Sequence, residues 1–230
     1  SGALYPLGYT TNTFKATDSD GNSSTCSFNI FVYDVEKPVI TCQPLVTVYT
    51  SSNSCSAIAT YSPPTATDNC GYSAIERLFG LPSGAFFPVG QSTVRFRATD
   101  SHNNTNDCGT VIRVRDTITP TIICPLNITS ATNINSCTAL VGFSPPSISD
   151  NCSATLSLIS GIAAGSTFPL GITTNIYKAT DASNNSSTCS MTITVEDRQR
   201  PTITCPENIT TEITSQHSCY KVVHFSNATY

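Results

Sequence analysis

Residues 189–195 read Cys-Ser-Met-Thr-Ile-Thr-Val, and residues 26–32 read Cys-Ser-Phe-Asn-Ile-Phe-Val. In both stretches every second residue is apolar or cysteine, while the residues between them are mostly polar. Side chains alternate between the two faces of a β-strand, so this period of two predicts a strand with one buried face. The chain lacks the 3.6-residue apolar stripe of an amphipathic helix. We therefore predict an all-β protein.

The strand recurs because the chain is a tandem repeat with a period of 81 or 82 residues. Every cysteine falls into one of four columns: Cys26, Cys108 and Cys189; Cys42, Cys124 and Cys205; Cys55, Cys137 and Cys219; Cys70 and Cys152. Short motifs such as Ala-Thr-Asp recur with the same spacing. A shared period of this kind predicts stacked copies of one small domain.

The period divides the chain into four modules. Residues 1–37 form the end of one module, 38–119 and 120–200 are complete, and 201–230 begin another. Turn signals at roughly ten-residue spacing predict about seven short strands per module, the pattern of an immunoglobulin-like β-sandwich. The links between modules are short and end in proline, which predicts a stiff rod. We expect the chain to continue past its last residue, and Cys26 to pair with an upstream cysteine.

Composition excludes several classes of partner. Only 11% of residues are charged, the net charge is −4, and 35 Thr and 30 Ser supply most of the polarity. Such a surface offers no dense basic patch for nucleic acid or an anionic membrane. No apolar stretch reaches the roughly 18 residues of a membrane span. Eleven cysteines without a Cys-x-x-Cys pair disfavour zinc and indicate disulfides in an extracellular compartment.

Four ordered motifs resemble the hyalin repeat (HYR) family. They are Pro-x-Ile-x-Cys-Pro at 201–206, Pro-Pro-x-x-x-Asp-Asn-Cys at 145–152, Phe-Pro-x-Gly at 168–171 and Ala-Thr-Asp-x-x-x-Asn-x-x-x-Cys at 179–189. The resemblance implies immunoglobulin-like modules of extracellular adhesion and matrix proteins, with a structural role and no catalysis. The chain departs from the family pattern at Gln43-Pro44, where proline is expected directly after cysteine.

No catalytic, metal or cofactor site is predicted. The chain contains no nucleophile elbow or phosphate-binding loop, and His102, His217 and His224 follow no ligand spacing. Acids recur near the module ends, at Asp18, Asp100 and Asp181, at Asp68 and Asp150, and at Asp34, Asp116 and Asp197. We expect them to cap turns. Calcium is the alternative, although each junction offers only about three of the six to eight oxygens that it prefers.

Disulfide pairing follows from the expected strand order. We predict Cys70–Cys108 and Cys152–Cys189 at one end of each sandwich, and local pairs Cys42–Cys55, Cys124–Cys137 and Cys205–Cys219. The rival is a bridge between modules, with Cys55 joined to Cys124 and Cys137 joined to Cys205. Sulfur–sulfur distances near 2.0 Å decide between these pairings.

Asn-x-Ser/Thr tripeptides predict N-linked glycans. The candidate acceptors are Asn22, Asn103, Asn127, Asn184, Asn185, Asn208 and Asn227. Asn151 is a weaker acceptor because Cys152 lies inside its tripeptide. We expect Asn127 and Asn208, which share a column, to point to solvent.

The predicted function is that of a secreted, glycosylated scaffold in a filament, matrix or adhesion layer. The expected partners are copies of the same protein, other matrix or cell-surface proteins, and N-linked glycans, with a lateral contact at Phe31 and Tyr33. The alternative is a cell-surface receptor segment that recognises a protein or glycan through its loops. The loop at 18–26 resembles the loop at 181–189, which favours the scaffold, since recognition loops diverge.

Overall fold

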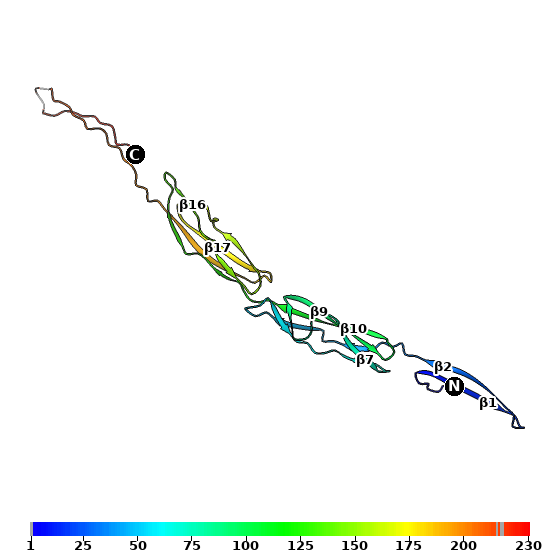
Figure 1. Cartoon of the computed structure of the whole chain (residues 1–230). Coiled ribbons are helices and arrows are strands. Elements are labelled where there is room, and N and C mark those ends of the chain that lie inside the picture. The colour runs from blue at the N-terminus through cyan, green and yellow to red at the C-terminus, as the bar shows by residue number, and fades with distance from the viewer. Residues whose placement is uncertain (1, 215, 217–218) are drawn as a thin grey trace. The chain divides into compact units, whose positions relative to one another are not determined.

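The computed structural model describes residues 2–214, 216 and 219–230 (Figure 1). His217, expected to be a solvated side chain, lies outside the described residues. The described residues form eighteen strands. They include no helix that is long and apolar enough to span a membrane. The all-β class predicted from the alternating pattern is therefore confirmed.

The first two strands form a hairpin. β1 (Gly8–Thr17) pairs antiparallel with β2 (Ser23–Val32) along their whole length. The apolar face of this hairpin is not covered by another sheet among the described residues, and Phe28 is accordingly exposed. Phe31 and Tyr33 stack with ring centroids 5.5 Å apart and are also exposed. Their lateral contact with another copy stays a prediction.

The first complete module contains eight strands, one more than the turn signals indicated. They are β3 (Val39–Thr41), β4 (Leu45–Tyr49), β5 (Ser56–Ala59), β6 (Thr65–Thr67), β7 (Tyr72–Phe79), β8 (Ala85–Pro88), β9 (Gly90–Asp100) and β10 (Thr105–Arg115). One sheet has the order β4-β10-β9-β7, and the pairs β3-β6 and β5-β8 form two smaller sheets. Within the larger sheet β4 runs parallel to β10, whereas β9 runs antiparallel to it.

The second complete module repeats this order. Its strands are β11 (Thr121–Ile123), β12 (Ile128–Ala131), β13 (Thr138–Val141), β14 (Ser147–Ser149), β15 (Ala154–Ser160), β16 (Ser166–Pro169), β17 (Gly171–Asp181) and β18 (Ser186–Glu196). The larger sheet is β12-β18-β17-β15, and the smaller pairs are β11-β14 and β13-β16. Among residues 201–230, Thr204 and Thr229 form an isolated antiparallel bridge.

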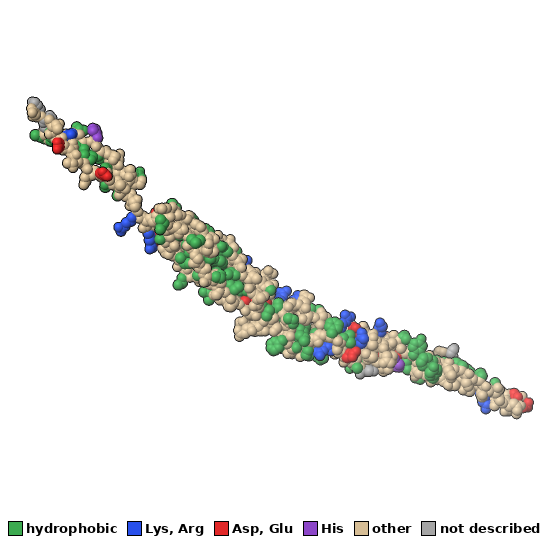
Figure 2. Space-filling model, turned by 45° about the horizontal axis from the view of Figure 1, so that its top comes forward, with side chains coloured by type: hydrophobic (Ala, Val, Ile, Leu, Met, Phe, Trp, Pro, Cys, Tyr) green, Lys and Arg blue, Asp and Glu red, His purple; other side chains and the backbone are tan. Residues whose placement is uncertain are grey.

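Each complete module has its own core between the large sheet and the smaller pairs. Phe87 and Phe168, at equivalent positions of β8 and β16, are both fully buried. Ile112 and Ile193, from β10 and β18, pack in the respective clusters. The apolar residues of the alternating stretch in β18, Met191, Ile193 and Val195, thus face the core of the second module. The immunoglobulin-like sandwich class is confirmed. Figure 2 shows that hydrophobic side chains also reach the surface, with few charged groups among them.

The compact units of the chain do not coincide with the modules read from the period. One unit comprises Ser1–Pro120 together with Ser149–Ala154 and Thr180–Ser186, two loops that belong by sequence to the second module. The other comprises Thr121–Ile148, Thr155–Ala179 and Ser187–Tyr230. The loops of one module are therefore integrated into the unit that contains the preceding module, and this places the candidate site.

Gly161 is required by the turn after β15. Its φ is +105°, and a Cβ there would lie 2.8 Å from the Cα of Asn175, whose side chain bonds both backbone groups of Ile162. We expect Gly161→Ala to lower the free energy of unfolding by about 2–4 kcal/mol, because the left-handed backbone and the clash add. Gly142→Ala is the matched control, since a Cβ at Gly142 meets nothing within 4 Å. Urea unfolding measures both, and equal effects would contradict the analysis.

Candidate functional site

Buried aspartates, Asp100 and Asp181, close the loops at one end of each complete module. Asp100 is 1% exposed, and its Oδ1 accepts hydrogen bonds from the backbone N–H of His102 and of Asn104, at 2.7 and 2.8 Å. Its Oδ2 accepts one from Asn104 Nδ2 at 2.7 Å. Asp18 and Asp181 make the same three kinds of bond in their loops. The expected turn capping is confirmed for this column of acids.

The amides in these loops also hold the segment that precedes the module. Asn104 Nδ2 donates to the carbonyl oxygen of Asp34 at 3.3 Å, and Asn185 Nδ2 donates to that of Asp116 at 3.1 Å. The prolines that end the two links, Pro38 and Pro120, are fully buried. The links predicted to be short and stiff are thus packed and hydrogen-bonded.

Asp116 is the single acid of the second link, residues 116–120. It is 6% exposed, and its Oδ1 accepts hydrogen bonds from Thr50 Oγ1 at 2.8 Å and from the Ile118 N–H at 3.1 Å. Asn151 Nδ2 donates to the same oxygen at 3.3 Å and to the carbonyl of Ser54 at 3.2 Å. Residues of both modules therefore converge on one carboxylate inside a single compact unit.

The predicted disulfide pairs are wrong. Cys42 bonds to Cys108 rather than Cys55, and Cys124 bonds to Cys189 rather than Cys137. The reason is the parallel pairing of the first and last long strands. β4 pairs with β10 in a register that sets Leu45 opposite Val111, and the same offset of 66 residues sets Cys42 opposite Cys108. In the second module the offset of 65 residues joins Cys124 to Cys189 in the same way.

The remaining disulfide joins the two modules. Cys55 bonds to Cys152, 97 residues away, so Cys152 does not pair with Cys189. A bridge between modules was the rival prediction, yet its proposed partner for Cys55, Cys124, is wrong. Cys55 precedes β5, and Cys152 lies in a loop that belongs to the same compact unit as the first module. The favoured prediction missed this pair because it placed both partners of every bond in one module, and the rival missed it because it joined Cys55 to Cys124.

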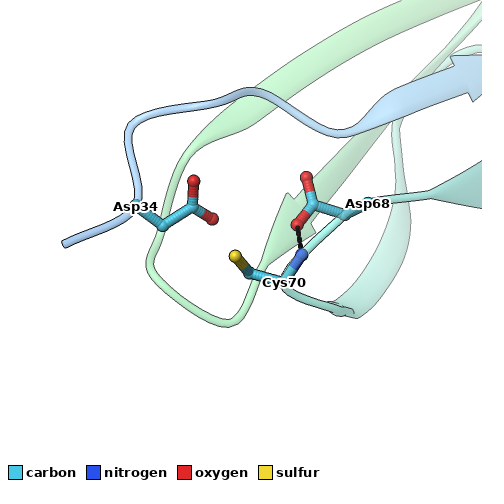
Figure 3. Close-up of side chains that lie close together, drawn as sticks. All are labelled: Asp34, Asp68 and Cys70. Carbon is cyan, nitrogen blue, oxygen red and sulfur yellow. Dashed lines mark hydrogen bonds between the residues drawn. The ribbon is translucent and has the colours of Figure 1, made fainter. Parts of the chain in front are cut away.

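Five cysteines have no disulfide partner among the described residues: Cys26, Cys70, Cys137, Cys205 and Cys219. The predicted pairs Cys70–Cys108 and Cys205–Cys219 and the rival pair Cys137–Cys205 are therefore absent from the described chain. Figure 3 shows the Cys70 side chain beside the carboxylates of Asp34 and Asp68, and Asp68 Oδ1 accepts a hydrogen bond from the Cys70 N–H at 2.8 Å. Burial and these two negative charges raise the pKa of the Cys70 thiol. Cys152 occupies the equivalent place beside Asp116 and Asp150.

The candidate glycan acceptors differ in their surroundings. Asn127 and Asn208 are exposed, as expected. Asn127 Oδ1 accepts from the Thr192 N–H at 2.9 Å, and this leaves its nitrogen without a hydrogen bond among the described residues. Asn185 donates through Nδ2 to both Asp181 and Asp116, so a sugar on that nitrogen would displace these bonds. Glycosylation at all of the named positions stays a prediction.

Comparisons with known proteins agree on one family. The model of the HYR domain matches residues 33–114 and 115–195. Hyalin of Strongylocentrotus purpuratus is 33% identical over 223 residues, which cover 90% of this chain and 18% of that protein. Hyalin of Lytechinus variegatus is 30% identical over 219 residues, which cover 91% of this chain and 41% of that protein. The chain therefore spans a minority of the length of both relatives.

Among solved structures, extracellular cadherin domains 1–5 of protocadherin gamma B2 align with 84% of this chain and 47% of that chain. The sequence identity is 15% and the TM-score is 0.34.

The observed pairing predicts which cysteines stabilise the second module. The Cys124–Cys189 bond closes a separation of 65 residues, so we expect Cys124→Ala/Cys189→Ala to lower the free energy of unfolding by about 4 kcal/mol. Cys137→Ala is the control, because Cys137 is exposed and unpaired among the described residues. Urea unfolding gives both values, and peptide mapping identifies the bonds. Recovery of a Cys124–Cys137 peptide would contradict the pairing.

Acid should weaken the loop that Asp100 closes. Burial opposes its ionisation, but hydrogen bonds from Asn104 and His102 dominate and lower the pKa of Asp100 below its ordinary value. A depressed pKa in the folded state means that the stabilisation is present above about pH 4 and is lost as the pH falls through the folded value.

We therefore expect Asp100→Asn to be less stable at pH 7 and to lose less stability between about pH 5 and pH 2 than the parent chain. Thermal unfolding across this range measures the difference. Asp20→Asn is the control, because the exposed Asp20 carboxylate makes no hydrogen bond among the described residues. Parallel pH profiles for the parent and Asp100→Asn would sink the interpretation.

Proposed function

Because the chain belongs to the HYR domain family, we propose that it is a segment of an extracellular adhesive scaffold with stiff joints between successive modules. The proposed modules are residues 1–37, 38–119, 120–200 and 201–230. Sugars on the exposed Asn-x-Ser/Thr sites would cover the outer faces. Other copies of the protein, or other matrix and cell-surface proteins, would be the partners.

The observation that carries this proposal is the Cys55–Cys152 disulfide. A bond between neighbouring modules stabilises neither sandwich alone, but it removes freedom from the joint. The network around Asp116 supports the same role, since Thr50 and Asn151 donate to one carboxylate from the two modules. Buried Pro120 adds a third restraint at this point.

The receptor alternative requires loops that are free to meet a ligand. At one end of each module the loops are already engaged: Asn104 and Asn185 hydrogen-bond to the preceding link. The same contact to the preceding link occurs in both complete modules, so these loop residues are not free to bind a ligand. The loops at this end therefore support a joint more than a recognition surface.

One pocket in the first module gives no support to catalysis. It is lined by Tyr61, Pro63, Pro64, Arg77, Pro82, Ser83 and Phe96. It presents no His and no carboxylate for acid–base chemistry. The Tyr61 hydroxyl is itself committed to the Leu81 carbonyl at 2.8 Å.

Stiffness of the joint is testable in solution with the secreted, oxidised chain. We expect Cys55→Ser/Cys152→Ser to broaden the distribution of chain dimensions in small-angle X-ray scattering, because the two modules lose their covalent link. Cys137→Ser, which alters an exposed unpaired thiol, should leave the scattering curve unchanged. Identical curves for all three proteins would contradict a stiffening role of the Cys55–Cys152 bond.

Adhesion is tested with beads that carry the same three proteins. The scaffold proposal expects beads coated with the parent chain to cluster with one another or to bind a matrix-coated surface. Binding to one soluble ligand without either kind of adhesion would favour the receptor alternative.

A further inference from the structure

The Cys55–Cys152 bond joins two sites of different kinds. The turn site, residues 54–56, lies before β5, and there Ser54 Oγ lies 2.9 Å from Ser56 Oγ and accepts from the Ser56 N–H at 3.2 Å. The loop site, residues 150–152, belongs to the next module, and there Asp150 Oδ2 accepts from the Cys152 N–H at 3.1 Å. Both kinds of site recur in the described chain with a cysteine that has no disulfide partner among the described residues.

The turn site recurs at Cys137 in the second module. Ser136 Oγ lies 2.8 Å from Thr138 Oγ1 and accepts from the Thr138 N–H at 3.2 Å, as in the first module. Cys137 is exposed, and so is Cys55 although it is bonded. The local structure that presents Cys55 to a neighbouring module is therefore already formed around Cys137.

A buried hydroxyl beside this second turn site also lacks its partner. Thr132 is 9% exposed, and its Oγ1 is buried without a hydrogen bond among the described residues. Thr50, its equivalent in the first module, donates to Asp116 Oδ1, a carboxylate that the next module also contacts. Asp197 is the counterpart of Asp116 but is exposed. Since buried hydroxyls rarely remain unpaired, Thr132 marks a surface that a following module would complete.

The loop site recurs at Cys70 in the first module. Asp68 Oδ1 accepts from the Cys70 N–H at 2.8 Å, and Cys70 is partly buried, as Cys152 is (Figure 3). The module also holds its preceding link in the same way, because Asn104 Nδ2 donates to the Asp34 carbonyl. Burial and nearby carboxylates raise the pKa of the Cys70 thiol, so a thiolate is disfavoured there. A disulfide carries no charge and suits this place.

We propose that Cys137 and Cys70 each form an inter-module disulfide of the Cys55–Cys152 kind with a neighbouring HYR module. Cys137 would bond to an Asp-Asn-Cys cysteine of the module that residues 201–230 begin. Cys70 would bond to a turn-site cysteine of the module that residues 1–37 end. This inference rests on the proposed scaffold of successive modules with stiff joints, and it makes the disulfide a feature of every joint.

Formation of each bond is an oxidation in the secretory pathway. Two thiols lose two protons and two electrons as the sulfur–sulfur bond forms. A disulfide of a secretory thiol oxidoreductase accepts them and becomes a dithiol.

The test places both halves of the proposed bond in one chain of known sequence. Residues 1–200 are fused directly to residues 38–230, so that Pro38 follows Arg200 where Pro201 follows it in the parent. Peptide mapping of the secreted, unreduced, monomeric fusion should recover a Cys137–Cys70 peptide beside the three bonds already observed. The monomeric parent should lack this peptide.

A thiol count gives a second measurement. Maleimide labelling in denaturant should find five free thiols in the parent and again five in the fusion, whereas seven would label in the fusion without the new bond. Cys70→Ser in the second copy of the module should abolish the Cys137–Cys70 peptide. The same substitution in the first copy is the matched control and should preserve it.

The Thr132 hydroxyl gives a measurement that does not depend on sulfur. Thr132→Val in the first copy should lower the unfolding temperature of the fusion by about 2 °C, because the hydroxyl gains a partner there. It should not lower that of the parent. Thr50→Val should lower the unfolding temperature of both proteins, since Thr50 donates to Asp116 in each.

The Cys42–Cys108 peptide shows whether the fused module has folded. A fusion that contains this peptide but leaves seven thiols free would overturn the proposal, and so would a bond from Cys137 to Cys205 or to Cys137 of another chain. A fusion that lacks the Cys42–Cys108 peptide would also count against it, because the first module would then not fit the place of a following one. Each of these results would leave the Cys55–Cys152 joint, with its scattering and adhesion tests, standing.

Discussion

The structure depends on the parallel pairing of the first long strand of each module with the last. β4 lies beside β10 and β12 beside β18, and both pairs are formed by strands more than sixty residues apart in the chain. This closure brings Cys42 to Cys108 and Cys124 to Cys189, and it sets the buried faces of β10 and β18 against Phe87 and Phe168. Closing a loop of more than sixty residues costs chain entropy, and a disulfide at that position removes most of this cost from refolding because the loop stays closed in the unfolded chain.

The same closure brings the end of β4 beside the end of β10, where the link to the next module begins. β10 ends at Arg115, whose carbonyl accepts from the Thr50 N–H, and Asp116 follows at once. The joint is therefore an extension of the hydrogen-bond ladder rather than a separate linker. Its carboxylate satisfies donors from both modules, which explains why two loops of the second module belong to the first compact unit.

The alternating pattern around Cys189–Val195 was sufficient to predict the all-β class and the buried face of β18, because burial on one face is a local property of a strand. The spacing of the turn signals predicted the sandwich. The turn-capping role of Asp100 was also accessible, since its partners lie within four residues. The pairing of Cys42 with Cys108 could not be predicted, because it depends on the order and register of strands far apart in the chain, which a single sequence does not reveal. The Cys55–Cys152 bond was less accessible still, since it depends on which loop of the next module meets the first. Nothing in the sequence indicated that Asp116 Oδ2 and Asp150 Oδ1 would be buried without a hydrogen-bond partner among the described residues, because burial is known only from the structure.

The arrangement of the disulfides limits how far the protein can be stretched. A pull on both ends passes from Cys42 to Cys108 through sulfur, along the chain to Cys124, and through sulfur again to Cys189. Between Cys42 and Cys189 the tension is carried by the two disulfides and by the 16 residue steps from Cys108 to Cys124, which span roughly 55 Å at full extension. Even if both sandwiches unfolded under load, the distance between Cys42 and Cys189 could not exceed this extended length plus the two disulfides. Its maximum length is therefore fixed by covalent bonds, whatever the folding stability of its modules.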